Sequence, residues 1–219
     1  MPSQSLPVAF FLALSGGFFD AYTYVCRDGV FANAQTGNMV MLGISVAKLN
    51  LHASFLYLIP ILAFVAGVFL SEVIKQKSST AESFSKFILL LEVLILLGVA
   101  FIPQRLNMLA NVLISFVCAM QMETFTKFEN QVIATTVSTG NLRKAAEFVF
   151  KAVTEKNRED MKIAFMYILI IALFVFGVVF GTWASDLFGI RSVWIAAALL
   201  FIGIVIITRK TEYIPESAA

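Results

Sequence analysis

Apolar segments about as long as a bilayer is thick recur along the whole chain, and this feature constrains the fold more than any other. At 1.5 Å rise per residue, about 20 helical residues cover the roughly 30 Å hydrocarbon core of a membrane. The composition agrees, because 59% of the 219 residues are hydrophobic and only 14% are charged. Soluble domains carry about a quarter charged residues. The sequence therefore predicts an all-α, polytopic integral membrane protein.

Six of these segments are predicted to cross the membrane as helices. Their approximate bounds are residues 6–26, 53–72, 87–102, 106–125, 163–184 and 193–208. Cytoplasmic loops of membrane proteins are enriched in Lys and Arg. With both termini in the cytoplasm, 12 cations lie inside and four outside, whereas an eight-span topology lowers the bias to ten against six. We therefore expect six spans with cytoplasmic termini.

The tripeptide Thr-Gly-Asn occurs twice, at 36–38 and at 139–141, and indicates an internal repeat. A shift of 103 residues that superposes the tripeptides also places Asp20 opposite Glu123. Because each half holds three spans, an odd number, the second half begins on the opposite side of the membrane. We expect two inverted three-helix repeats, residues 1–103 and 104–219, within one membrane domain.

Each tripeptide lies in an unusual connection between two spans. Residues 27–51 are too polar for an easy span and too apolar for a solvated loop, so a re-entrant segment or a half-helix is predicted. In the second connection, residues 127–162, Asn141 is expected to cap an amphipathic helix that rests on the membrane surface.

At the mouth of a half-helix, Gly and Asn aim N–H groups and side-chain dipoles at a solute. The alternative is a purely structural helix start, which needs only a Gly and a capping Asn. The structural explanation suits the second tripeptide better, because an amphipathic helix follows it, and a solute-facing role suits the first.

Three acidic residues fall within predicted spans: Asp20, Glu92 and Glu123. A carboxylate in hydrocarbon costs a few kcal/mol on insertion scales, so such residues usually face a cavity or a partner. In an inverted pair of repeats, Asp20 and Glu123 are expected to line one pathway and to bind a cation, a proton or an amine. The alternative is that both reach interfacial water from near their helix ends. For Glu92 a structural hydrogen bond is an equal alternative to transport.

The expected pathway residues thus combine the three acids with the two tripeptides. They are Asp20, Thr36, Gly37, Asn38, Glu92, Glu123, Thr139, Gly140 and Asn141. Small residues at matching places in the two halves let helices approach closely, since lipid offers no hydrophobic drive for association. The expected packing residues are Gly16, Gly17, Gly67, Ser71, Gly177 and Gly181.

No nucleotide-binding loop, catalytic Ser-His-Asp set or zinc-ligand spacing occurs in the sequence. The two cysteines are isolated and the single histidine, His52, lies in a short polar connection, so no metal site and no cofactor are expected. The net charge of +2 is too small to indicate nucleic acid as a partner. We expect a protein that is not an enzyme, with the bilayer and a small solute or ion as partners; a homo-oligomer is left open.

Two stretches of the first half are similar to a known family. Residues 15–21 read Ser-Gly-Gly-Phe-Phe-Asp-Ala, and Phe31 is followed by Thr36-Gly37-Asn38 and then by Leu42-Gly43. This pattern resembles the YoaK-like family of small bacterial membrane proteins, a domain of unknown function, over most of the chain. The resemblance implies a six-span protein of the bacterial inner (cytoplasmic) membrane and brings no substrate. The matching positions are Gly17, Asp20, Thr36, Gly37, Asn38 and Gly43.

A secondary transporter or channel for a small solute, with proton or cation coupling as an option, is the leading functional hypothesis. Its pathway is expected between the two repeats. One alternative is a non-catalytic scaffold or lipid-binding protein, in which the basic residues of 141–156 contact anionic headgroups. A weaker alternative is an intramembrane hydrolase that uses Asp20 and Glu123 as a dyad sharing one proton. A continuous polar cavity would favour transport, and a solid core would favour the scaffold.

Overall fold

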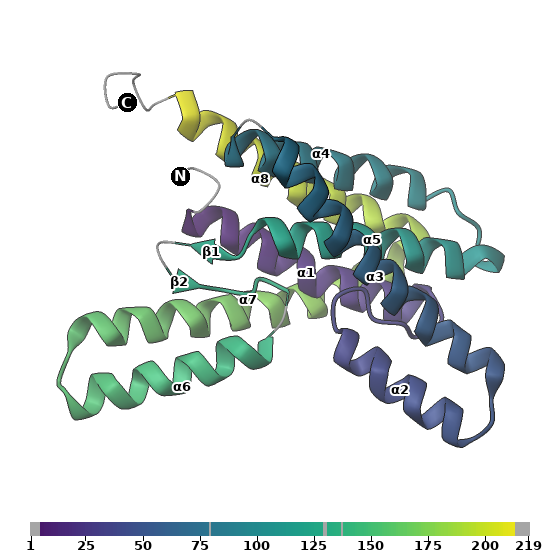
Figure 1. The fold of residues 1–219 in the computed structure, drawn as a ribbon, viewed down its shortest axis with the longest axis horizontal. Helices are drawn as coiled ribbons and strands as arrows, with labels where there is room; N and C mark the ends of the chain where they lie inside the picture. The colour runs from purple at the N-terminus through teal and green to yellow at the C-terminus, as the bar shows by residue number, and fades with distance from the viewer. Residues whose placement is uncertain (1–4, 79, 129–130, 137, 213–219) are drawn as a thin grey trace.

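The computed structural model describes residues 5–78, 80–128, 131–136 and 138–212. This part of the chain is an all-α bundle with one short β-hairpin, and the predicted fold class is confirmed at that level (Figure 1). The helices are α1 (Leu6–Cys26), α2 (Gln35–Ala47), α3 (Leu51–Lys77), α4 (Ala81–Val99), α5 (Asn107–Thr124), α6 (Ser138–Thr154), α7 (Arg158–Phe188) and α8 (Val193–Glu212). Short 3₁₀ helices, η2 (Gln104–Leu106) and η3 (Gly189–Ser192), precede α5 and α8.

Four helical stretches of the described residues are long and apolar enough to cross a membrane. They are Leu6–Cys26, Leu51–Lys77, Gln104–Thr124 and Arg158–Arg209, and the last of these holds α7 together with most of α8. Helix α4 has 19 residues, and its charged residues are Glu82, Lys86 and Glu92. The chain is therefore a membrane protein by the length and hydropathy of its helices.

Several helices are longer than the hydropathy predicts, because polar residues cap them beyond their apolar segments. The Asn50 side chain accepts a hydrogen bond from the Ala53 N–H at the start of α3. The Thr80 hydroxyl caps α4 in the same way, and Asn157 caps α7. A capping side chain satisfies one of the orphan N–H groups of the first turn. Helix α7 consequently reaches 31 residues.

Two close helix pairs form the centre of the bundle: α1 packs along α7, and α3 packs along α5. A Cβ atom at Gly17 would overlap the Phe174 carbonyl, and one at Gly177 would overlap the Leu14 carbonyl. In the other pair, Gly67 lies against the Phe116 carbonyl in the same way. Such contacts need the absence of a side chain, so glycine sets how closely these helices approach.

The remaining expected packing residues also lie at helix contacts. A Cβ atom at Gly181 would meet Phe18 of α1, and one at Gly16 would meet Thr136 in the segment before α6. Ser71 of α3 is fully buried. Helices α4 and α8 complete the bundle. They pack on each other, and in addition α4 packs on α5 and α8 packs on α1. The apolar core is continuous between α1, α4, α5, α7 and α8.

Two shorter helices form hairpins with their successors and extend toward opposite ends of the molecule (Figure 1). Helix α2 pairs with α3, and α6 pairs with α7. At 1.5 Å per residue, the 13 residues of α2 span about 20 Å, which is less than a bilayer core. Helix α6 runs back along α7, and the expectation that it rests on the membrane surface stays a prediction.

A buried arginine, Arg27, connects the end of α1 with the segment between α4 and α5. The Arg27 guanidinium donates to the carbonyls of Val99 and Ile102 and to Asn107 Oδ1, at 2.9–3.0 Å. Its Nε donates to the Tyr22 hydroxyl at 3.0 Å. The arginine thus satisfies carbonyl groups that the end of α4 leaves open, and it ties α1 to the α4–α5 connection. No pattern in the sequence indicated this role.

Candidate functional site

The two Thr-Gly-Asn tripeptides border one cavity of about 370 Å³. It lies where α2 and α6 begin, between residues contributed by α3, α5 and α7. The two short helices diverge from it toward opposite ends of the bundle (Figure 1). Its lining residues are Asn33, Ala34, Gln35, Thr36, Phe64, Met122, Thr136, Ser138, Thr139 and Phe174. Each tripeptide contributes its threonine to this cavity.

The first asparagine, Asn38, holds the segment before α2 in place. Its amide binds both main-chain groups of Phe31, accepting from the N–H at 2.9 Å and donating to the carbonyl at 2.8 Å. It also donates to Gln35 Oε1 at 2.9 Å. Asn38 is fully buried and its hydrogen-bonding groups are used within the protein. The structure therefore gives it a supporting position behind the cavity.

Asp20 of α1 binds the main chain of the same segment. Its Oδ1 accepts the N–H groups of Asn33 at 2.7 Å and Ala34 at 3.4 Å, immediately before α2. Asp20 is 5% exposed. A carboxylate in this place offsets both the orphan donors and the positive end of the helix dipole. Asp20 also lines a second, smaller cavity of about 200 Å³, which shares Phe174 with the first.

The second asparagine, Asn141, repeats the contacts of the first. Its amide donates to the Ala134 carbonyl at 2.6 Å and accepts from the Ala134 N–H at 3.3 Å. Like Phe31 and Asn38, these partners are seven residues apart. The predicted cap at Asn141 is wrong, because α6 begins at Ser138 and the side chain points back to the preceding segment. The two asparagines bind the segments that precede α2 and α6, and the two threonines line the cavity between these helix starts.

The floor of the cavity is polar and lies inside the protein. Asn33 and Thr136 are 2% and 1% exposed, whereas Thr36 and Thr139 at its edge are exposed. Asn33 donates through Nδ2 to the Gly16 carbonyl at 3.1 Å. Within the described residues, Asn33 Oδ1 and Thr136 Oγ1 have no hydrogen-bond partner. A buried polar atom without a partner is costly, so two of them at one cavity suggest a place for a ligand or water.

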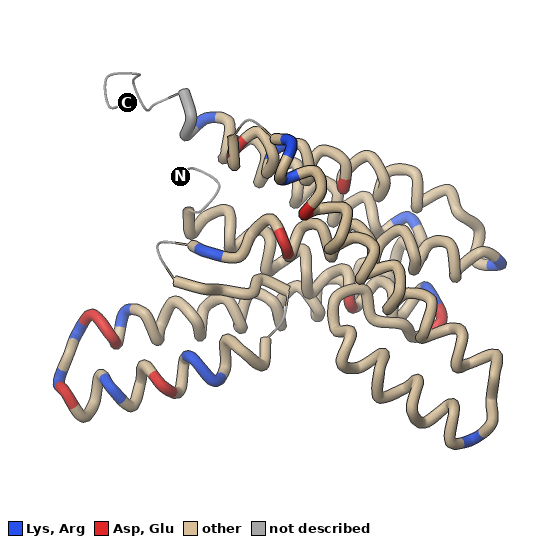
Figure 2. Tube along the Cα trace, viewed as in Figure 1, with Lys and Arg blue, Asp and Glu red and all other residues tan. Residues whose placement is uncertain are grey.

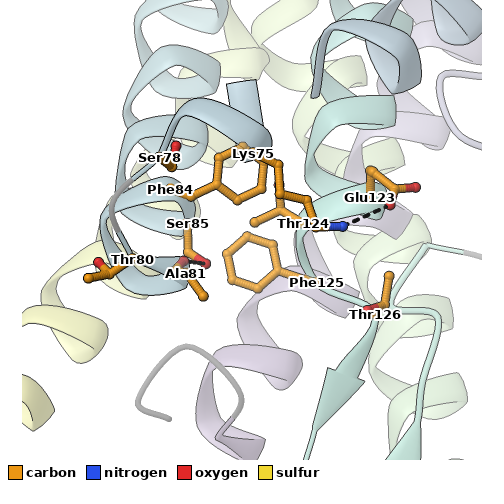
Figure 3. A pocket seen from close by; sticks show the side chains of 10 residues that line it. All are labelled: Lys75, Ser78, Thr80, Ala81, Phe84, Ser85, Glu123, Thr124, Phe125 and Thr126. Atoms are coloured by element: carbon orange, nitrogen blue, oxygen red, sulfur yellow. Dashed lines mark hydrogen bonds and ion pairs between the residues drawn. The ribbon is translucent and has the colours of Figure 1, made fainter. Parts of the chain in front are cut away.

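Glu123 does not lie at this cavity. It lines a different pocket of about 340 Å³ near the α3–α4 connection, together with Lys75, Phe84 and Phe125 (Figure 3). Lys75 of α3 reaches across this pocket to the Glu123 carboxylate at 3.5 Å and also binds Glu72 at 2.9 Å. The expectation that Asp20 and Glu123 line one pathway is therefore not met in this structure.

Glu92 is the most deeply buried acid of the described chain. It is 0% exposed, and in the described residues neither of its carboxylate oxygens has a hydrogen-bond partner. The thiol of Cys118 on α5 lies within electrostatic reach of Glu92 and of Asp20, and beside the Asn33 side chain. Glu92 does not line the cavity between the tripeptides.

The glycines of the two tripeptides do not line the cavity. A Cβ atom at Gly37 would come within 2.9 Å of the Phe31 ring, so this glycine leaves room for the segment that Asn38 holds. A Cβ atom at Gly140 would meet no described atom within 4 Å. The two glycines therefore differ in their surroundings although their sequence context is the same.

The predicted pathway residues left out eight of the ten lining residues, although the repeat contained the signal for six of them. The shift of 103 residues pairs Asn33 with Thr136 and Gln35 with Ser138. A shift of 110 residues, which matches Phe-Val-Ala-Gly-Val at 64–68 with Phe-Val-Phe-Gly-Val at 174–178, pairs Phe64 with Phe174. Positions that pair in this way and lie beside a common axis border the same space. Met122 has no lining counterpart among the described residues, and no pattern in the sequence pointed to it.

The chain is similar to known proteins along nearly its whole length. Residues 8–206 match the family model described as "Protein of unknown function (DUF1275)". The chain is also 24% identical over 201 residues to the UPF0700 transmembrane protein YoaK of Bacillus subtilis (strain 168), covering 87% of this chain and 88% of that relative. No solved structure matches it. Because the family model matches residues 8–206 and the helices are long and apolar enough to cross a membrane, this chain belongs to the DUF1275 family of transmembrane proteins.

Proposed function

We propose that this protein is a secondary transporter or channel for a small solute, with a pathway that passes between two inverted repeats. The observation that carries the proposal is the single cavity bordered by both tripeptides, where α2 and α6 begin. Secondary transporters commonly bind solutes at the ends of discontinuous helices near the bilayer midplane. A polar floor inside an apolar bundle fits this use.

The helix contacts support inverted repeats. Swapping the two halves turns the α1–α7 pair into the α5–α3 pair, and the α2–α3 hairpin into the α6–α7 hairpin. Asn38 and Asn141 bind equivalent residues, Phe31 and Ala134. In Figure 1 the two hairpins point to opposite ends of the bundle, as a twofold axis in the membrane plane requires.

The distribution of charge supports six crossings with cytoplasmic termini in a bacterial inner membrane. The start of α1, the end of α8 and the α6–α7 hairpin lie at one end of the bundle (Figure 1). Charged residues concentrate on α6 and the start of α7 at this end, and the α2–α3 hairpin at the other end is nearly uncharged (Figure 2). By the positive-inside rule the charged end faces the cytoplasm. Helices α2 and α6, with 13 and 17 residues, are about 20 Å and 26 Å long, and both are shorter than the roughly 30 Å core.

Buried carboxyl groups beside the cavity support proton coupling. Asp20 binds the main chain of the lining residues Asn33 and Ala34, and the buried Glu92 lies within electrostatic reach of the Cys118 thiol, as Asp20 does. Buried ionisable residues of this kind in transporters relay protons. Glu123, with its Lys75 partner at another pocket, is assigned to the structure of that end of the bundle.

The two alternatives receive less support. A hydrolase dyad needs its carboxyls within hydrogen-bond reach of one another, whereas Asp20 and Glu123 line different cavities and bind different partners. A scaffold needs no cavity, whereas both tripeptides border one.

Flux through proteoliposomes tests the proposal. Purified protein is reconstituted, and the entry of glycerol, urea, formate and choline is followed with and without a pH gradient. We expect at least one solute to enter faster than into protein-free liposomes. Asp20→Asn should weaken any dependence on the pH gradient, and Glu123→Gln should retain it. Entry of all four solutes at the protein-free rate, with folded protein in the membrane, would overturn the transport proposal.

A further inference from the structure

We propose, resting on the function proposed above, that the cavity between α2 and α6 binds a small uncharged solute that carries both hydrogen-bond donors and acceptors, such as an alcohol or an amide. The inference comes from the groups that line the cavity, from those that are already used within the protein, and from the partners that the remaining groups require.

The size and lining of the cavity limit the size and the charge of a ligand that fits it. Its volume of about 370 Å³ lies near the small end of the roughly 300–1,000 Å³ seen for small-molecule sites. None of the ten described residues that line it is charged. The side chains that offer polar atoms are hydroxyls and amides, which bind neutral polar groups by hydrogen bonds.

An anion would find few free donors at the start of α2. Helix N-termini bind anions through exposed N–H groups, but four of the N–H groups here are already bound within the protein. Asp20 accepts the N–H groups of Asn33 and Ala34, and the Gln35 N–H binds the Asn33 carbonyl at 2.8 Å. The Gly37 N–H binds the Ala34 carbonyl at 2.8 Å. In addition, the free atom of Asn33 is an acceptor, which an anion without hydrogens cannot satisfy.

A cation is disfavoured for the opposite reason. Helices α2 and α6 both begin at the cavity, so the positive ends of their dipoles point toward it. No carboxylate is present among the described lining residues to balance a positive ligand. Asp20 lines the neighbouring, smaller cavity and not this one, and its Oδ1 already accepts from two main-chain N–H groups.

A neutral solute with both kinds of group satisfies the floor. Neither Asn33 Oδ1 nor the Thr136 hydroxyl is exposed in this structure, so binding requires both side chains to turn toward the cavity. A ligand N–H or O–H then donates to Asn33 Oδ1, and a ligand oxygen accepts from the Thr136 hydroxyl. The rings of Phe64 and Phe174, together with Met122, supply apolar walls for a short carbon skeleton. A cavity with polar atoms on its floor and apolar walls above them is complementary to a small molecule that has a polar and an apolar side.

The decisive experiment compares solutes and variants in the proteoliposome assay. Full-length protein is tested with glycerol and urea as neutral probes, formate as the anion and choline as the cation. We expect glycerol or urea to enter faster than into protein-free liposomes, with formate and choline unchanged. Thr136→Val keeps the shape of the side chain and removes the hydroxyl, and should slow neutral-solute entry about threefold to tenfold, as loss of one hydrogen bond predicts.

Matched controls separate a solute contact from a folding defect. Thr23→Val removes an equally buried hydroxyl that binds the Phe19 carbonyl within α1, and it should leave entry unchanged. Thr139→Val, at the exposed edge of the cavity, provides a second test if Thr136→Val fails to fold. Entry of formate or choline alone, or equal entry in wild type, Thr136→Val and Thr139→Val, would overturn the solute class while leaving transport intact. Entry of none of the four would overturn both proposals.

Discussion

The two tripeptide regions share a main-chain arrangement and differ in their charges. In both, an asparagine amide binds the N–H and carbonyl of the residue seven positions earlier, Phe31 or Ala134. The acids aligned by the repeat do different things: Asp20 binds the segment before α2, whereas Glu123 forms an ion pair with Lys75. What the halves have in common is therefore the way a chain segment is held before a short helix.

The short helices differ just as clearly on their outer surfaces. Helix α2 exposes apolar side chains, among them Met39 and Val40, while α6 carries Lys144 and Lys151 in ion pairs with Glu147. Fixing an irregular segment inside a bundle is a demand that both halves meet, since main-chain polar groups there must be satisfied. In the inverted arrangement that we propose, the two outer surfaces face different sides of the membrane, and this difference accounts for their different charges.

The strongest test of the shared arrangement is loss of each asparagine. Asn38→Ala removes three hydrogen bonds and leaves partly buried main-chain groups of Phe31 unpaired, so we expect it to lower the free energy of unfolding by about 2–4 kcal/mol. Asn141→Ala removes two, one of them long, and should cost about 1–2 kcal/mol. Unfolding of the purified variants in detergent measures both. Equal or negligible losses would show that the amides do not hold these segments.

The glycines of the tripeptides should respond in opposite directions. Gly140→Ala adds a methyl group to a helix without meeting described atoms, and should stabilise by about 0.5–1 kcal/mol. Gly37→Ala forces the Phe31 ring to move from its stack on Tyr24, and should destabilise by about 1 kcal/mol. The same unfolding measurement applies. Stabilisation by both substitutions would mean that the two helix starts have the same space around them.

The smallest expected effect concerns the charges found on α6 and absent from α2. Hydrogen bonds from Lys144 and then Lys151 hold the pKa of Glu147 below its ordinary value of 4.5. A lowered folded pKa stabilises the protein above pH 4.5, and this contribution is lost as the pH falls through the folded value. We expect wild type to melt slightly higher than Glu147→Gln at pH 6, with the difference vanishing below the folded pKa. A difference that persists unchanged at pH 3 would exclude the ion pairs as its origin.

Much of the site was predictable, and the failures have a common physical cause. The tripeptides, the acids and the repeat were visible because they are departures from an apolar background. The position of Glu123 was missed because helix packing brought Lys75 of α3 to it. The role of Arg27 was missed because its partners, such as Val99 and Asn107, lie more than 70 residues away in the sequence. Long-range partners of polar residues cannot be read from spacing.

By itself the sequence determined that this protein is an all-α bundle in a membrane, because only helices satisfy the main chain of long apolar segments. It also determined the six apolar segments and the family, and it indicated the repeat. Tertiary structure alone decided that Thr36 and Thr139 border one cavity with Asn33 and Thr136 at its floor. That outcome depends on how closely α1 approaches α7 and α3 approaches α5. Close approach is set by three-dimensional contacts at Gly17, Gly67 and Gly177.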